Sequence, residues 1–267
     1  MDKAHIQTEQ QLKALEKELK KIYKGTLLEV LDACRAQYKQ LKEEDTAEAR
    51  KELKRLETLL RKVSVEATKT NGLAMEMLQT QLGKVVDINN TFAYAQILDI
   101  FEAEGLSMSY NLLDRAAIAV ILKGDAFKEV AIDAFEDKAR IYTGLRRAMA
   151  QSLITGEGAD KMSSRIQKVM ENEYFEAMRI ARTETTKAQN SSRDAHYKQA
   201  QELGIEIKKK WVATKDERTR DSHKALDGKI IDYDKEFKNG CKFPGVGPGK
   251  EVINCRCTFT AVFDEED

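Results

Sequence analysis

The sequence predicts an α+β protein with a predominantly helical body, long N-terminal helices and a small C-terminal domain with a few β-strands. Three observations support this fold class. Charged residues make up 34% of the 267-residue chain and aromatic residues only 7%, which favours long solvated helices. Apolar residues follow helical spacing over most of the chain. After Gly204 the spacing alternates, and the last quarter holds both prolines, the single tryptophan and three of the four cysteines.

Charge and hydropathy exclude several classes of protein. The 45 basic and 45 acidic residues balance, so net charge indicates neither a nucleic-acid-binding tail nor a membrane-surface protein. The longest apolar run, residues 116–122, is much shorter than the roughly 20 residues that a transmembrane helix needs. The N-terminus lacks the apolar core of a signal peptide. Four unevenly spaced cysteines favour a reducing compartment, so we expect synthesis in the cytoplasm and no membrane partner.

Two long helices are predicted at the N-terminus. An apolar stripe at three- and four-residue steps covers residues 10–41, and Gly25 is a point where this helix could bend or break. A polar turn at residues 43–46 leads into a second helix with Leu53, Leu56 and Leu60 on one face. The pair is therefore expected to form an antiparallel hairpin, either an arm that binds a partner or a hairpin that packs on its own protein. Cys34 lies on the stripe and is expected to be a buried, inert thiol.

Shorter helices are predicted in the middle of the chain. Turn signals at residues 71–72 and 87–90 separate them, and helices are expected at 91–104, 111–123 and 125–143. A further helix is predicted from Asp160 to Leu203, with one break near Asn172. His196, among polar neighbours in this helix, is expected to be exposed.

Alternation predicts strands in the C-terminal part. Ile205, Ile207, Lys209 and Trp211 should share one face of a first strand, and residues 229–233 form a second. Between them, a capping box at residues 214–217 is expected to begin a short helix. A last strand over residues 252–263 should point the Cys255 and Cys257 side chains the same way. Arg256 would then emerge on the opposite face and pair with Glu184 or Asp216.

A metal site is one interpretation of the cysteines. His223, Cys255, Cys257 and Cys241 together would make a Cys3His set, which is a known structural zinc set. The spacing is not that of a zinc finger, and small buried thiols are the alternative. The sequence leaves zinc and no metal both open.

Two other chemical interpretations remain open. A nucleic-acid surface could combine phosphate contacts with base stacking, and its residues would be Lys208, Lys209, Lys210, Trp211, Arg218 and Arg220. A metal-dependent hydrolase could centre on Asp216 and His223. However, helical salt bridges explain the spacing of Asp216 and Arg220, and the sequence assigns no catalytic residue.

Several unusual motifs occur in a fixed order between Glu157 and Phe263. They are ARTETTKAQN, a tryptophan, DERTRDSH with ALDG, a Pro/Gly loop and INCRC. This order resembles the phage head morphogenesis family, whose members are similar to the Mu F protein and the SPP1 minor head protein. The matching residues are Arg182, Thr183, Glu184, Trp211, Asp216, Arg218, Arg220, His223, Gly228, Pro244, Asn254, Cys255, Arg256 and Cys257. Cys241 lies outside the motif.

The resemblance implies a domain organisation and a role. Residues 156–263 would form the head morphogenesis domain, residues 1–155 a helical region that docks on the portal or another partner, and 264–267 an acidic tail. The protein would be a minor capsid protein of a tailed phage that acts in head assembly, and DNA packaging or delivery is a further possibility. Its expected location is the head interior near the portal vertex, and its expected partners are the portal protein, viral DNA, and the scaffold or major capsid protein. The resemblance implies no enzymatic activity.

Overall fold

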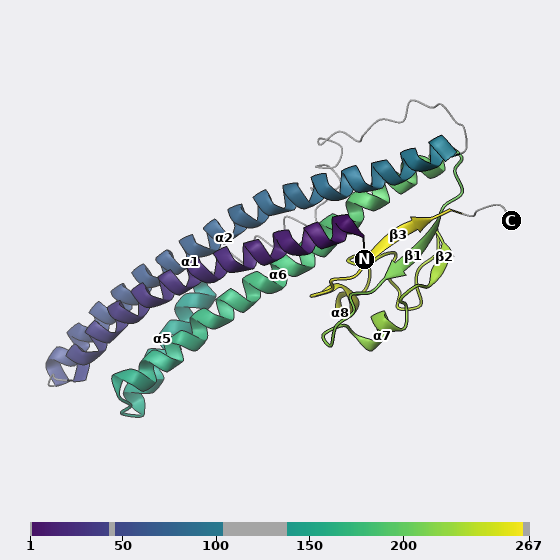
Figure 1. The fold of residues 1–267 in the computed structure, drawn as a ribbon. Coiled ribbons are helices and arrows are strands. Elements are labelled where there is room, and N and C mark those ends of the chain that lie inside the picture. Colours follow the sequence, from purple (N-terminus) through teal and green to yellow (C-terminus); the bar gives the residue numbers. More distant parts are fainter. Residues whose placement is uncertain (1, 43–45, 104–137, 264–267) are drawn as a thin grey trace. The chain divides into compact units, whose positions relative to one another are not determined.

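The computed structural model describes residues 2–42, 46–103 and 138–263, and it confirms the predicted α+β class (Figure 1). Its helices are α1 (Lys3–Lys42), α2 (Thr46–Ala103), α5 (Lys138–Ile154), α6 (Ala159–Glu202), α7 (Asp221–Lys224) and α8 (Gly249–Val252). Its strands are β1 (Lys208–Val212), β2 (Ile230–Asp232) and β3 (Thr258–Val262). None of the described helices is long and apolar enough to cross a membrane. The helices predicted at 111–123 and, for most of its length, 125–143 lie outside the described residues.

The chain forms two compact units, each built from several segments. Unit 1 comprises residues 1–15, 78–128 and 179–267, and unit 2 comprises residues 16–77 and 129–178. The boundary between them falls inside α1, α2 and α6. Each unit therefore draws residues from both sides of the domain boundary expected near residue 156.

Unit 2 is helical and has its own apolar core. Leu60, Leu145, Met149 and Ile166 are examples of its fully buried side chains, and they come from α2, α5 and α6. Cys34 of α1 belongs to the same core and is completely buried, as expected from its place on the apolar stripe. Burial raises the pKa of this thiol to about 12, so it stays protonated and unreactive.

The predicted antiparallel pairing of the first two helices is confirmed, but the predicted interruptions are wrong. In unit 2 the Tyr23 hydroxyl donates to the Asn71 side chain at 2.6 Å, and Gly25 leaves α1 unbroken. In unit 1 the Asn89 amide donates to Thr8 at 2.9 Å. The asparagines expected to form turns therefore sit inside the continuous helix α2, where buried hydrogen bonds outweigh their turn propensity.

Helix α6 is also longer and more buried than expected. It continues through Asn172 without a break. His196 was predicted to be exposed, and this is wrong: its ring is fully buried and hydrogen-bonded to the Asn90 side chain of α2. Burial lowers the pKa of His196 to about 4, so the ring is neutral near pH 7.

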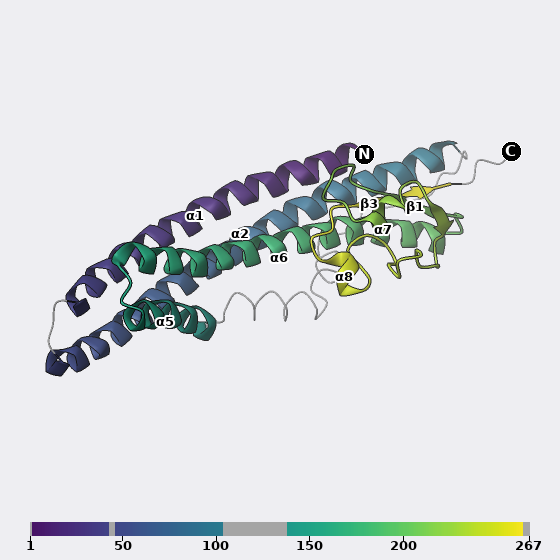
Figure 2. The ribbon, with the colours of Figure 1, turned by 90° about the horizontal axis from the view of Figure 1, so that it is seen from below.

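Unit 1 contains the sheet, in which β1 is the central strand between β2 and β3 and both pairings are antiparallel. Both views place β3 beside α6 (Figure 1, Figure 2). As predicted, Lys209 and Trp211 share one face of β1, and the structure shows that this face is buried. Phe259 of β3 packs edge-on against Tyr197 of α6, with ring centroids 5.6 Å apart, so an aromatic core joins the sheet to the helix.

Two local predictions in the C-terminal part are wrong. Thr214 does not begin a helix, because residues 216–219 form a bend and turn and α7 begins only at Asp221. The Asp216 carboxylate accepts hydrogen bonds from the Arg218 amide and the Thr219 hydroxyl, which stabilises this turn. The last strand begins at Thr258 and not at residue 252, because Asn254 adopts a left-handed φ of 57° that ends the preceding short helix.

Candidate metal centre

A polar face of α6 positions the segment that carries two cysteines. Thr186 donates a hydrogen bond to the carbonyl of Cys255, and Asn190 donates to the carbonyl of Cys257 at 3.2 Å. The Asn190 carbonyl oxygen also accepts from the amide of Phe259 at 3.3 Å. Residues 254–257 precede β3 and lack ladder partners, so these helix side chains satisfy main-chain groups that would otherwise be buried without a partner. The polar residues of the TETTKAQN motif therefore have a structural role.

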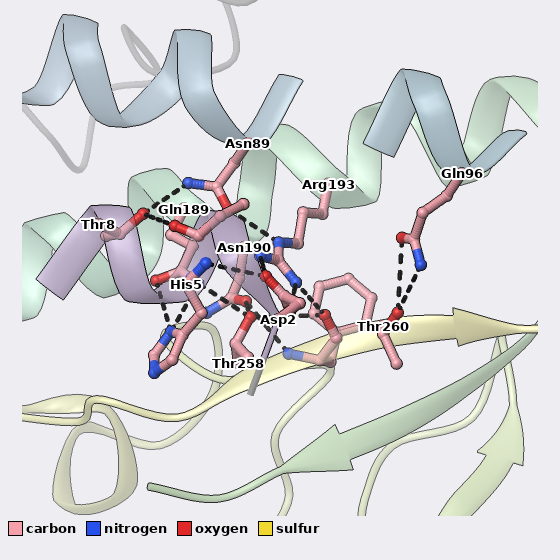
Figure 3. Close-up of polar contacts among 12 residues, drawn as sticks. Asp2, His5, Thr8, Asn89, Gln96, Gln189, Asn190, Arg193, Thr258 and Thr260 are labelled. Atoms are coloured by element: carbon pink, nitrogen blue, oxygen red, sulfur yellow. Dashed lines mark hydrogen bonds and ion pairs between the residues drawn. The ribbon is translucent and has the colours of Figure 1, made fainter. Parts of the chain in front are cut away.

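One turn further along α6, Arg193 joins β3 to the N-terminus (Figure 3). Its guanidinium is fully buried and makes hydrogen bonds at 2.8–3.0 Å to the Asp2 carboxylate, to Asn89 and to the carbonyl of Phe259. Burial alone would raise the pKa of Asp2, but the hydrogen bonds and positive charge of Arg193 outweigh burial and lower it. A buried, compensated ion pair therefore fixes the start of α1 within unit 1.

His223, Cys255 and Cys257 come together in unit 1. Their candidate ligand atoms all lie within 4.8 Å of one another, and all three residues are buried. The His223 Nδ1 atom lies 3.4 Å from the Cys257 sulfur and 3.7 Å from the Cys255 sulfur. His223 comes from α7, whereas both cysteines precede β3, so the site joins two segments that are distant in the sequence.

Glu251 and Trp211 hold the His223 ring in place. The Glu251 carboxylate lies 3.0 Å from His223 Nε2 and accepts a second hydrogen bond from Ser222 at 2.9 Å. Burial alone would raise the pKa of Glu251, but these hydrogen bonds and the nearby positive charges lower it, so the group is a carboxylate. A carboxylate only accepts, so His223 Nε2 carries the proton and the Nδ1 lone pair faces the thiols. The edge-on Trp211 ring, 5.1 Å away between centroids, closes the other side.

The cysteines of the chain differ in environment. The hydrogen bond with Cys255 and the contact with His223 outweigh burial and lower the pKa of Cys257. By contrast, burial raises the pKa of Cys241 to about 11. Cys241 belongs to the same buried cluster as Trp211, but it is not one of the three described residues whose ligand atoms converge. The structure thus brings together three of the four ligands suggested by the sequence.

The residues suggested for nucleic-acid binding do not form one surface. Trp211 is fully buried and Lys209 is 3% exposed, so neither can reach a base or a phosphate in this structure. Lys208 and Lys210 lie on the opposite, partly exposed face of β1. Arg220 uses its guanidinium to bind main-chain carbonyls of Glu251 and Ile253, whereas the Arg218 side chain is 72% exposed. The alternation that marks this strand also places the tryptophan inside.

Asp216 has a structural partner. The Arg256 guanidinium binds the Asp216 carboxylate through two contacts of 2.6 and 2.7 Å, and this pairing lowers the pKa of Asp216 to about 2. The sequence had offered Asp216 and Glu184 as the two alternative partners of Arg256. Within the described residues, the cluster of metal-ligand type contains His223 but not Asp216. The pair of residues expected for a hydrolase is therefore not assembled as a metal site.

The remaining motif residues also have structural surroundings. Glu184 is buried, burial raises its pKa, and one of its oxygens has no hydrogen-bond partner within the described residues. The left-handed Gly228 ends the turn after α7, where its amide binds the carbonyl of Trp211. The Asn254 amide binds the Thr183 hydroxyl at 3.0 Å, and Arg182 is half-buried on α6.

Sequence reasoning missed several residues that build the site: Thr186, Asn190, Arg193, Ser222 and Glu251. A signal existed for three of them. Thr183, Thr186, Asn190 and Arg193 recur at three- and four-residue steps, which places polar side chains on a single face of α6. The sequence held no comparable signal for Glu251, because its contact with His223 depends on how the loop between β2 and β3 folds.

Comparison with known proteins agrees with the order of these motifs. Residues 143–260 match the family described as Phage Mu protein F like protein. Minor head protein GP7 of Bacillus phage SPP1 is 29% identical over 220 residues, which is 80% of this chain and 68% of GP7. The C-terminal half of the chain is therefore similar to this Phage Mu protein F like family. The α6 face, the His223 cluster and the Asp216–Arg256 pair all lie within this family's matched region.

Two other relatives are similar to part of the chain, and the chain spans only about a third or less of their length. A protein of Enterococcus faecalis named NAD(+)–arginine ADP-ribosyltransferase EFV is 32% identical over 168 residues, 61% of this chain but only 34% of that protein. An uncharacterised protein of Haemophilus influenzae is 28% identical over 123 residues, which is 46% of this chain and 25% of its own length. No solved structure is significantly similar to the chain.

Proposed function

We propose that this protein is a minor head protein of a tailed phage, present in the virion head, where it acts in head assembly and docks on the portal. The observation that carries the proposal is the similarity to SPP1 GP7, because it extends well beyond the family domain. The family region covers residues 143–260, whereas the GP7 match covers 80% of the chain. Few residues follow position 260, so most of the additional similarity lies before residue 143.

Unit 2 exposes large apolar side chains of the kind that protein docking uses. Examples are Leu28 on α1, which is 54% exposed, Leu73 on α2, which is 52% exposed, and Phe175 on α6, which is 63% exposed. Single exposed apolar residues are common, but aromatic side chains are enriched in protein interfaces. Unit 2 is also the unit that lacks the sheet and the candidate metal centre. Docking through unit 2 would leave the site in unit 1 available for its own role.

A co-expression pull-down tests portal docking. The chain is expressed with the portal protein of the same phage genome, and the wild type is expected to co-purify with it. The substitution F175S should weaken recovery at least several-fold, since it removes an exposed aromatic contact. The matched control is I230S, which replaces a 48% exposed apolar residue of unit 1 and should leave recovery unchanged. Portal recovery that is undetectable with the wild type would refute docking.

The proposed role is structural and not enzymatic. The ADP-ribosyltransferase name belongs to a protein of which this chain spans only 34%, so the name does not carry that activity to this chain. The motif residues Asp216 and Arg256 bind each other, and His223 faces two thiols. Purified chain incubated with NAD⁺ and an arginine-containing acceptor protein should give no transfer above the background without protein. Transfer that scales with chain concentration would contradict this assignment.

DNA contact is the second candidate function, and one observation favours it. A pocket of about 670 Å³ in unit 1 is lined partly by three lysines, Lys229, Lys238 and Lys250. Lysines at such a position can bind phosphate groups, and binding of this kind weakens steeply with salt. If the chain contacts DNA here, the triple substitution of these lysines by glutamine should lower duplex affinity at low salt. Duplex binding that is absent, or insensitive to salt, would exclude this candidate.

A further inference from the structure

The two sulfur–nitrogen distances at His223 match those expected around a tetrahedral zinc ion. Zinc bonds of about 2.3 Å to sulfur and about 2.0–2.1 Å to nitrogen place the two ligand atoms about 3.5–3.6 Å apart. The two sulfur–nitrogen distances are 3.4 and 3.7 Å, so both lie within about 0.2 Å of this value. Cys255 and Cys257 are neighbours in one segment, whereas His223 is more than 30 residues away in the sequence and is brought to them by the fold.

The candidate ligand atoms of all three residues converge on one place. His223 Nε2 carries the proton that is donated to Glu251, so Nδ1 has a single lone pair. Both sulfurs face that lone pair, and Cys255 and Cys257 also form a hydrogen bond with each other. A metal ion bound by Nδ1 and by both sulfurs uses all three groups at once.

The surroundings of His223 are those of a metal-bound histidine. Such histidines commonly donate their other N–H to a carboxylate, which fixes the tautomer and makes the ring a stronger ligand. Glu251 occupies this position at 3.0 Å and is itself held by Ser222. The amide of Cys257 points at the sulfur of Cys255 at 3.4 Å, a contact that stabilises a thiolate.

Charge and size also favour a metal ion here. Two thiolates neutralise a divalent cation, so the buried centre would carry no net charge. The segments it would join are short: α7 has four residues, β3 has five, and the surrounding core cluster is small. Small folds with little apolar core commonly use a structural metal to hold their segments together.

We propose that His223 Nδ1, Cys255 Sγ and Cys257 Sγ bind one zinc ion, which joins α7 to the segment before β3 and stabilises unit 1. Two thiolates and an imidazole bind zinc in preference to magnesium or calcium, which favour oxygen ligands. Both thiols release their protons to solvent when the ion binds. This inference does not rest on portal docking, because the metal is expected in the isolated chain.

Metal analysis of the purified, reduced full-length chain tests the proposal. We expect one zinc ion per chain by elemental analysis, and cobalt substitution should give the absorption bands of a tetrahedral centre with thiolate ligands. The substitutions C257S and H223Q should each remove the metal. The control C34S, which replaces a buried thiol in the core of unit 2, should retain it.

Two further measurements keep the test independent of misfolding. Removal of zinc from the wild type with a chelator should lower its melting temperature, and added zinc should restore it. The substitution E251Q keeps all three ligands, so it should retain zinc but bind it about 10- to 100-fold more weakly. Wild-type chain without zinc and without cobalt bands, or C257S with unchanged zinc content, would overturn the proposal.

Discussion

The ion pair between Asp2 and Arg193 provides a direct test of how unit 1 is held together. The substitution D2N keeps the size of the side chain and one acceptor oxygen, but it removes the negative charge. Arg193 is fully buried and directs two hydrogen bonds, at 2.8 and 2.9 Å, to this carboxylate. After the substitution, the positive charge stays buried without its counter-charge.

The magnitude follows from the burial of each partner. Removal of one partner from a buried ion pair costs roughly 3–5 kcal/mol when both groups are excluded from water. The Asp2 side chain is 21% exposed, and asparagine keeps an acceptor for Arg193. We therefore expect D2N to lower the free energy of unfolding by about 2–3 kcal/mol near pH 7.

Urea unfolding at a series of pH values is the appropriate assay. The folded-state pKa of Asp2 is lowered, so its stabilisation is present above the unfolded pKa and is lost as the pH falls through the folded value. The difference between wild type and D2N should stay constant from pH 8 to 5 and shrink below about pH 4. The control E18Q replaces an exposed carboxylate on the same helix and should change stability by less than about 0.5 kcal/mol. A D2N effect no larger than that of E18Q would refute the reasoning.

Three further predictions concern unit 1. Burial lowers the pKa of His196 to about 4, so as the pH falls the unfolded chain takes up a proton at this residue before the folded chain does. The free energy of unfolding should therefore fall between about pH 7 and pH 4. In urea unfolding, H196Q should show a shallower fall with pH, and the same fall as in the wild type would contradict this. The substitution N190A leaves the Cys257 carbonyl and the Phe259 amide without their partner and should cost about 2–4 kcal/mol, whereas N172A at an exposed position of α6 should have little effect. A Cβ at Gly245 would lie 2.9 Å from the α6 backbone, and Gly245 has a φ of +92°, so G245A should lower the melting temperature. The control G249A adds a Cβ in open space and should leave the melting temperature unchanged. Equal melting temperatures for the two variants would disprove the close approach.

The sequence allowed the fold class and the alternation of faces along β1 to be predicted, because both depend on the spacing of apolar residues. The pairing of Arg256 with Asp216 was one of two predicted alternatives and is present. The errors arose where polar residues make distant contacts. Asn71 and Asn89 look like turn residues locally, yet their side chains bind Tyr23, Thr8 and Arg193 inside continuous helices.

The candidate site was predictable in part. Residue types alone brought His223, Cys255 and Cys257 into one hypothesis, and the structure places their ligand atoms together. The sequence could not show that Trp211 is buried against His223, and so it could not exclude base stacking by the indole. Nor could it reveal Glu251, since that contact needs the folded loop between β2 and β3.

The most direct test of the proposed role is the protein content of proheads purified from cells in which the phage genome is expressed. Proheads assembled with the portal protein and proheads assembled without it are compared by quantitative mass spectrometry, with the major capsid protein as the reference. A portal-docked minor head protein should be present in the first sample at far fewer copies than the capsid protein and be depleted in the second. Absence from portal-containing proheads, or equal amounts in both samples, would contradict the account.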